Sequence, residues 1–145
     1  MIAISSRELP VSAQVAWEML QTSDVQMSIS RGFFSYSDRL PDVREEGFTF
    51  ATRLKLFGSI PTWIHSQRLA KVDNVARELV MDESGLPYRS WQHRMMVAEL
   101  APDRCRFTDE IRVSSGLTTV LAWGFASLLC SQRARRLYGL ALARQ

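Results

Sequence analysis

The chain has 145 residues, of which 46% are hydrophobic and 23% are charged, a composition and length typical of a single globular domain, here residues 1–145. Its 18 Lys and Arg residues exceed its 15 Asp and Glu residues by a net charge of +3, too small and too dispersed to predict nucleic-acid binding. Cys105 and Cys130 have no metal-binding spacing and there are only two histidines, so we expect no zinc finger, disulfide framework, metal site or cofactor.

No segment has the character of a targeting signal or a membrane span. The N-terminus, Met1–Arg7, lacks the basic and then apolar order of a signal peptide. The most apolar stretch, Leu117–Cys130, is shorter than the roughly 20 residues that a spanning helix needs, and it fits a buried core helix better. We therefore expect a soluble, cytoplasmic protein without a transmembrane segment, and nothing in the sequence indicates its oligomeric state.

The N-terminal part of the chain predicts a strand followed by two short helices. Residues 2–9 form the strand, which Pro10 ends because proline cannot donate to a β-ladder. Ser12 is placed to cap the first helix. The segment Thr22–Asp24 ends that helix and can cap a second one running through Ile29. The apolar residues of the first helix fall at helical spacing: Ala13, Ala16, Trp17 and Leu20.

After Gly32 the pattern changes from helical to alternating, which predicts about six consecutive antiparallel strands. Pro102 stands where a type I turn favours proline, between the last two of these strands. A meander of this kind buries one face and needs an apolar element to cover it. The predicted strands cover residues 33–38, 48–56, 62–72, 78–82, 88–100 and 105–113.

The remaining residues predict one long terminal helix, with Ser115 as its expected cap. The first half of this helix is apolar on nearly every side, so we expect it to be heavily buried. The sequence does not determine which of its faces points inward. The basic run of residues 133–136 favours an interaction with the helix dipole over a contact with acidic lipid. In the second half, Cys130, Ala134, Leu137 and Ala141 form an apolar stripe, whereas Arg133, Arg136 and Arg144 are expected to point elsewhere.

The order of these elements predicts an α+β protein. A curved antiparallel sheet of about seven strands wraps around the long C-terminal helix, and two short helices follow the first strand. The closing helix is the only predicted element long and apolar enough to cover the sheet, so the sheet must curl around it.

This order resembles, over essentially the whole chain, the helix-grip fold of the START-like (SRPBCC) superfamily, which includes the birch-pollen allergen and bacterial polyketide cyclases. Locally, the segment Gly85–His93 followed by Arg106–Ile111 is similar to a bacterial subgroup of cell-division inhibitors and ligand-binding proteins. That subgroup usually has a second histidine where this chain has Met95. The resemblance implies a cavity between sheet and helix for a hydrophobic or amphipathic small molecule, and it does not imply a reaction.

His93 and Asp109 are the strongest candidates for chemistry. Their inward faces can be joined through a three- or five-residue loop or through a bulge. With three residues, Met95 faces Asp109 and His93 faces Ile111, so that His93 and Asp109 are diagonal neighbours about 7–8 Å apart. The pair could orient a ligand's polar end or act as a general acid and base, or it could be a buried pair that satisfies itself.

The function that these patterns favour is the binding of a lipid, an aromatic or a polyketide-like compound, more a binding protein than an enzyme. The alternatives are an aromatase/cyclase that uses His93 and Asp109, and an interaction module whose cavity is vestigial. Aromatic residues on the inner face fit either the core or the wall of a cavity. The candidate ligand-binding residues are Phe50, Leu54, Trp63, His65, Gln67, Trp91, His93, Met95, Phe107, Asp109, Phe125 and Leu128.

Overall fold

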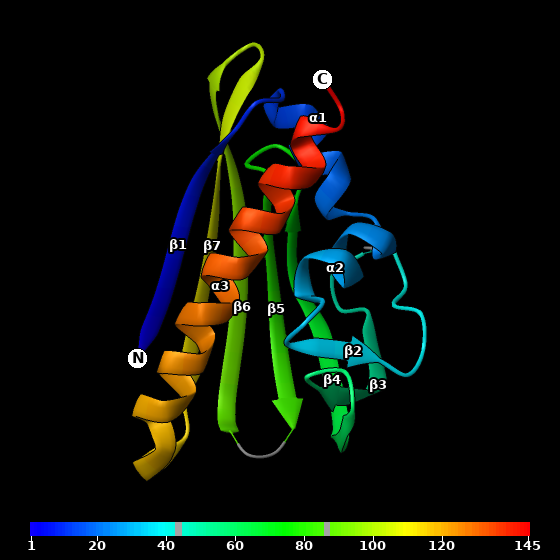
Figure 1. The fold of residues 1–145 in the computed structure, drawn as a ribbon, viewed down its shortest axis with the longest axis vertical. Helices are drawn as coiled ribbons and strands as arrows, with labels where there is room; N and C mark the ends of the chain where they lie inside the picture. Colours follow the sequence, from blue (N-terminus) through cyan, green and yellow to red (C-terminus); the bar gives the residue numbers. More distant parts are fainter. Residues whose placement is uncertain (43–44, 86–87) are drawn as a thin grey trace.

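The computed structural model describes residues 1–42, 45–85 and 88–145, with the side chain of Trp63 excepted. Figure 1 shows the chain with α1 and the C-terminus at the upper end and the start of α3 at the lower end. Among the described residues no helix combines the length and the apolar character needed to cross a bilayer. In chain order the elements are β1 (Ile2–Leu9), α1 (Ala13–Leu20), α2 (Ser23–Ser30), β2 (Phe34–Tyr36), β3 (Thr49–Leu56), β4 (Ile60–Asp73), β5 (Glu78–Gly85), β6 (Tyr88–Ala101), β7 (Arg104–Ser114), a short 3₁₀ helix η1 (Gly116–Thr118) and α3 (Thr119–Leu142).

The strands form one seven-stranded antiparallel sheet in the order β1-β7-β6-β5-β4-β3-β2. Strands β2 to β7 are neighbours in sequence order, as the alternating pattern predicts, and β1 returns to pair with β7. The sheet curls, and α3 crosses it diagonally over β1 and β7 (Figure 1). The predicted α+β helix-grip architecture is therefore confirmed.

The core lies between the concave face of the sheet and the helices. Trp17 of α1, Met95 of β6, Phe107 of β7 and Leu137 of α3 belong to one continuous apolar cluster. Each is almost completely buried, and burial of a large apolar side chain stabilises the fold by about 1.5–3 kcal/mol. Two of the predicted ligand-binding residues, Met95 and Phe107, are thus core residues.

The pairing of β6 with β7 confirms the register predicted for the candidate pair. Met95 lies opposite Asp109, and His93 lies opposite Ile111. The ladder closes between Ala101 and Arg104, and a shift between Glu99 and Ala101 restores the parity that so short a turn would otherwise break. The sequence allowed a three-residue loop, a five-residue loop or a bulge between these strands, and the structure has the bulge.

Local capping positions the helices. Ser12 caps α1 as predicted, since its Oγ accepts a hydrogen bond from the Val15 N–H. At the C-terminal end of the sheet, Ser115 precedes η1 rather than α3, and Gly116 takes the left-handed φ of 62° that glycine adopts without strain. The hydroxyl of Thr119 accepts a hydrogen bond from the Ser115 N–H, so this side chain links the end of β7 to the start of α3.

The prediction of a heavily buried first half for α3 is wrong. Leu117, Val120, Leu121 and Leu128 are exposed. In Figure 1 the start of α3 extends below the beginning of β1, the edge strand that the rest of the helix crosses. The sheet covers only one side of a helix, so an all-round apolar sequence leaves its remaining sides in solvent. The buried residues of α3 form a single stripe: Ala126, Leu129, Cys130, Arg133, Ala134, Leu137 and Ala141.

Candidate functional site

His93 lies at the centre of a buried cluster of ionisable side chains. It projects from the inward face of β6 and has no exposed surface, and the same holds for Asp109 on β7. Nε2 of His93 donates to Oδ1 of Asp109 at 2.5 Å. Nδ1 of His93 lies 3.6 Å from a carboxylate oxygen of Glu83. The imidazole is therefore placed between two carboxylates, and the predicted His93–Asp109 contact is direct.

Glu83, on the inward face of β5, connects this pair to a second histidine. Nε2 of His65 lies 3.0 Å from Oε2 of Glu83, and the amide of Gln67 lies 3.3 Å from the same histidine nitrogen. On the other side of the ring, Nδ1 of His65 lies 3.3 Å from the hydroxyl of Tyr88. A continuous polar chain therefore runs from Tyr88 through His65 and Glu83 to His93.

Arg133 completes the cluster, and the prediction that it points away from the apolar stripe is wrong. The side chain is only 5% exposed. Its Nη1 lies 3.2 Å from Nδ1 and 3.1 Å from Nε2 of His93, and its Nε donates to Oγ of Ser30. A buried guanidinium requires compensating charge, and Asp109 and Glu83 supply it. Position 133 continues the stripe three residues after Cys130, so the spacing itself contained the signal.

The cluster perturbs the ionisation of its members. Burial and Arg133 both lower the pKa of His93, but the charge of Asp109 and hydrogen bonds to Asp109 and Glu83 outweigh them, so the pKa is raised. Burial raises the pKa of Glu83, but hydrogen bonds to His65 and His93 lower it more strongly. We infer a charged state in which carboxylates and cations balance one another inside the fold.

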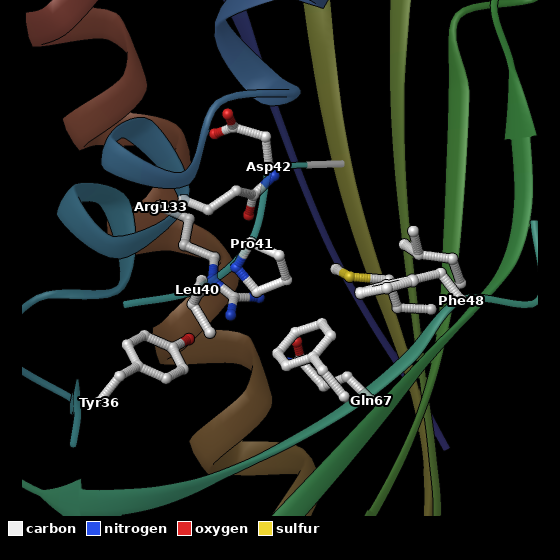
Figure 2. Close-up of a pocket in the computed structure, with 11 residues that line it drawn as sticks. Tyr36, Leu40, Pro41, Asp42, Phe48, Gln67 and Arg133 are labelled. Atoms are coloured by element: carbon white, nitrogen blue, oxygen red, sulfur yellow. The ribbon is translucent and has the colours of Figure 1, made fainter. Parts of the chain in front are cut away.

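The middle of the concave face is filled rather than hollow. Figure 2 shows Arg133 reaching from α3 toward Tyr36, with Gln67 of β4 and Phe48 across the pocket. The space left there is about 30 Å³, and the hollow beside His65 is about 10 Å³. Volumes of this size hold about one or two water molecules and not an organic ligand.

A larger hollow, which we call the apolar pocket, opens at the lower end of the molecule. Its volume is about 320 Å³, at the small end of the range for ligand pockets. Phe125 forms part of its wall with its ring edge toward Phe34, at a centroid distance of 5.5 Å. The rings of Tyr88 and Trp91 lie 4.8 Å apart. The lining residues are Phe34, Leu56, Tyr88, Trp91, Ser115, Thr118, Leu121, Ala122 and Phe125.

Tyr88 joins the two parts of the site. It lines both the apolar pocket and the small hollow beside His65, and Trp91 does the same. Since the Tyr88 hydroxyl contacts His65, the polar chain ends at the wall of the apolar pocket. His93 and Asp109 are not among the residues that line this pocket.

The structure brings some predicted site residues together and separates others. Trp91 and Phe125 line the apolar pocket. Leu54 lies beside the small hollow and Phe50 beside the pocket of Figure 2. Leu128 is 62% exposed on the outer side of α3, away from the cluster. The side chain of Trp63 and two residues of the predicted turn, Leu86 and Pro87, lie outside the described residues. His65, Gln67, His93 and Asp109 meet in the buried cluster, and the remaining two predicted members are the core residues Met95 and Phe107.

Sequence reasoning missed Glu83, Arg133 and Tyr88 as members of the site. Glu83 follows Leu79 and Met81 in the inward parity of β5, and these two are buried core residues. A carboxylate at an inward-facing position of β5, after two apolar residues of the same parity, was the sequence signal that Glu83 belongs to the site. Tyr88 offered no comparable signal, because its role depends on β4 bringing His65 alongside.

Comparisons with known proteins identify the fold. No family model matches the chain, and no curated protein matches it. A START superfamily protein from Mycobacterium smegmatis matches with a TM-score of 0.71 and 12% identity, covering 99% of both chains. An aromatase/cyclase from a Streptomyces species matches with a TM-score of 0.67 and 13% identity, covering 99% of this chain and 94% of that one.

A third solved structure has a bound ligand. Norcoclaurine synthase from Thalictrum flavum, in complex with dopamine and hydroxybenzaldehyde, matches with a TM-score of 0.69 and 12% identity, covering 100% of this chain and 88% of that one. At this level of identity the likeness shows the fold and not the activity. The chain has a START-like (SRPBCC) fold, so the fold that the sequence resemblance implies is confirmed.

Proposed function

We propose that the protein binds a small hydrophobic or amphipathic molecule in the apolar pocket, with the polar end of that molecule at the Tyr88 hydroxyl. The observation that carries this proposal is the pocket itself, about 320 Å³ and lined chiefly by aromatic and aliphatic side chains. Burial of a ligand's apolar surface there would supply about 25 cal/mol per Å², before the costs of ordering. The ligand-bearing synthase of the same fold supports the same conclusion by analogy.

The polar chain from Tyr88 through His65 to Glu83 determines whether the Tyr88 hydroxyl donates a hydrogen bond to a ligand or accepts one from it. We assign the proton of His65 to Nε2, the nitrogen that faces Glu83, and Nδ1 then accepts a hydrogen bond from the Tyr88 hydroxyl. With its own proton committed to His65, the Tyr88 oxygen is an acceptor for a ligand. A hydroxyl or amine donor on the ligand fits this arrangement best.

Ligand binding is favoured over catalysis because of where the candidate pair lies. An aromatase/cyclase that uses His93 and Asp109 requires these groups to touch the reacting molecule. Both are fully buried, and Tyr88 and Trp91, rather than this pair, line the apolar pocket. The pair is better suited to fixing the polar chain that orients Tyr88.

A matched pair of probes tests the proposal, namely 2-naphthol, which carries a hydroxyl donor, and naphthalene, which does not. Both should bind the wild-type protein. Tyr88→Phe keeps the ring and removes the acceptor, so 2-naphthol should bind roughly fivefold more weakly, as expected for one neutral hydrogen bond, while naphthalene binding stays unchanged. Fluorescence titration measures both.

A second variant tests the pocket itself. Ala122 lines the apolar pocket, so Ala122→Phe should fill part of it and weaken both probes. Ala143→Phe makes the same change at an exposed position at the far end of the chain and should have no effect. Equal binding by the wild-type protein and Ala122→Phe would remove the apolar pocket from the function. Native mass spectrometry of freshly purified protein would then show whether a cellular ligand co-purifies elsewhere.

A further inference from the structure

The mouth of the apolar pocket is surrounded by exposed apolar side chains that belong to segments distant in sequence. Phe57 and Ile60 flank the β3–β4 turn, Leu117 lies in η1, and Val120 and Leu121 lie in the first turn of α3. Each is more than half exposed. We call these five residues the apolar tip. Figure 1 places the β3–β4 turn and the start of α3 at the same lower end of the molecule.

The apolar tip is continuous with the pocket. Leu121 is exposed at the tip and also lines the pocket, and Leu56, opposite Ile60 in the sheet, lines it as well. Phe57 lies 6.3 Å from Phe33, ring centroid to centroid. The exposed apolar surface is therefore the rim of an opening and not a set of scattered side chains, which would need no explanation.

Within three segments that form the tip and most of the pocket wall, the charged residues have one sign, while Asp82 and Glu83 of β5 line a surface hollow beside Arg89. Residues 54–67, 84–92 and 113–132 contain no Asp or Glu, and their only Lys or Arg residues are Lys55 and Arg89. Both are exposed. Lys55 precedes Leu56 in β3, and the guanidinium carbon of Arg89 lies 3.8 Å from where a Cβ would stand on Gly116, beside Leu117. The chain has 15 acidic residues elsewhere, so their absence from these three segments is a local feature.

We propose that the apolar tip docks on the surface of a lipid bilayer that contains anionic lipids, with the mouth of the pocket facing the lipid. Exposed apolar side chains beside Lys55 and Arg89, on segments that carry no carboxylate, match the boundary between acyl chains and anionic headgroups. This complementarity favours a bilayer as the occupant. The positive charge beside the tip gives no comparable reason to expect a protein partner or a second copy of the chain. The proposal does not depend on the function proposed for the pocket.

Vesicle co-sedimentation with matched variants tests the proposal. Wild-type protein should bind vesicles of phosphatidylcholine with 30 mol% phosphatidylserine, and bind phosphatidylcholine vesicles at least tenfold more weakly. Arg89→Gln should weaken binding to the anionic vesicles roughly fivefold, the effect of one cation near such a surface. Raising the salt concentration from 0.05 to 0.5 M should weaken binding further.

Two Val→Asp substitutions separate docking from nonspecific adhesion. Val120 is 63% exposed at the tip, and Val75 is 91% exposed in the β4–β5 turn at the other end of the sheet. Val120→Asp should reduce vesicle binding at least tenfold and retain naphthalene binding, since Val120 is not a lining residue of the pocket. An acidic residue in the first turn of a helix is also compatible with folding. Val75→Asp should bind vesicles like the wild-type protein.

Other outcomes overturn the proposal. Failure of wild-type protein to bind the anionic vesicles would do so, as would equal losses in Val120→Asp and Val75→Asp. A dimer in solution that Val120→Asp converts to a monomer, without vesicle binding, would assign the tip to contact between copies of the chain instead. If the wild-type protein binds the anionic vesicles but does not bind naphthalene, the function proposed for the pocket is wrong and the docking surface stands.

Discussion

Asp109→Asn provides the sharpest test of the buried charge cluster, because it removes one charge and leaves the shape of the side chain almost unchanged. Asp109 is fully buried and accepts a hydrogen bond from His93. Its removal leaves His93 and Arg133 opposed by Glu83 alone. Removing one partner of a buried ion pair costs about 3–5 kcal/mol. For a chain of 145 residues that corresponds to a fall in Tm of roughly 10–16 °C.

The loss should depend on pH in a defined direction. The pKa of His93 is raised in the folded protein, chiefly through Asp109 against the opposing effect of burial. A raised pKa contributes stability below the unfolded value of about 6.5, and this stability is lost as the pH rises through the folded value. Asp109→Asn has lost most of the stability that comes from the raised pKa of His93, and it has done so at every pH. The difference between wild type and Asp109→Asn should therefore be larger at pH 6 than in alkaline solution.

Urea unfolding followed by tryptophan fluorescence measures both effects, and Asp82→Asn is the matched control. Asp82 lies on β5 and accepts a hydrogen bond from Gln92 at the exposed face, so its loss should cost less than about 1 kcal/mol. A double-mutant cycle with His93→Gln should give a coupling energy above about 1 kcal/mol. If Asp109→Asn is no more destabilising than Asp82→Asn, the buried cluster does not carry the charges assigned to it.

Further expectations follow from burial and ionisation. Stability should be greatest between about pH 4.5 and 6.5, because the pKa of Glu83 is lowered and that of His93 raised; urea midpoints across pH 3–9 would show this, and a flat profile would contradict it. Leu137→Ala should cost about 2–5 kcal/mol, whereas Leu128→Ala on the exposed side of the same helix should cost under about 0.5 kcal/mol, both by urea unfolding. Both cysteines are buried with raised pKa values, so a thiol reagent should label them in urea and not in the native protein.

The strand pattern and the register of the central pair could be predicted from the sequence because they depend on local parity. Alternation of inward and outward residues assigned His93 and Asp109 to one face, and the short connection at Pro102 limited the pairings to a few. The structure selects the bulged pairing. Sheet curvature followed from the need to cover one apolar face, whereas the pairing of β1 with β7 was not predicted and is shown by the structure.

The inner face of α3 could not be predicted, because its first half is apolar on nearly every side and has no charged residue to mark the solvent side. Leu121 and Leu129 are both leucines, yet the first is exposed and the second buried. What separates them is the length of sheet available beneath the helix, which is a tertiary property. Arg133 was missed for a different reason, since propensity places arginine outside unless its partners are known. Those partners, Asp109 and Glu83, come from other strands.

Arg133 also explains why the ligand space lies where it does. Its side chain lines both small hollows under the middle of α3, and it occupies space that an apolar residue of the stripe would leave open. Because the guanidinium is held by Ser30 and faces the carboxylates of Asp109 and Glu83, displacing it would expose buried charge. A ligand in the apolar pocket therefore meets Tyr88 and Trp91 as an inner wall, and the buried cluster limits the length of molecule that the fold can enclose.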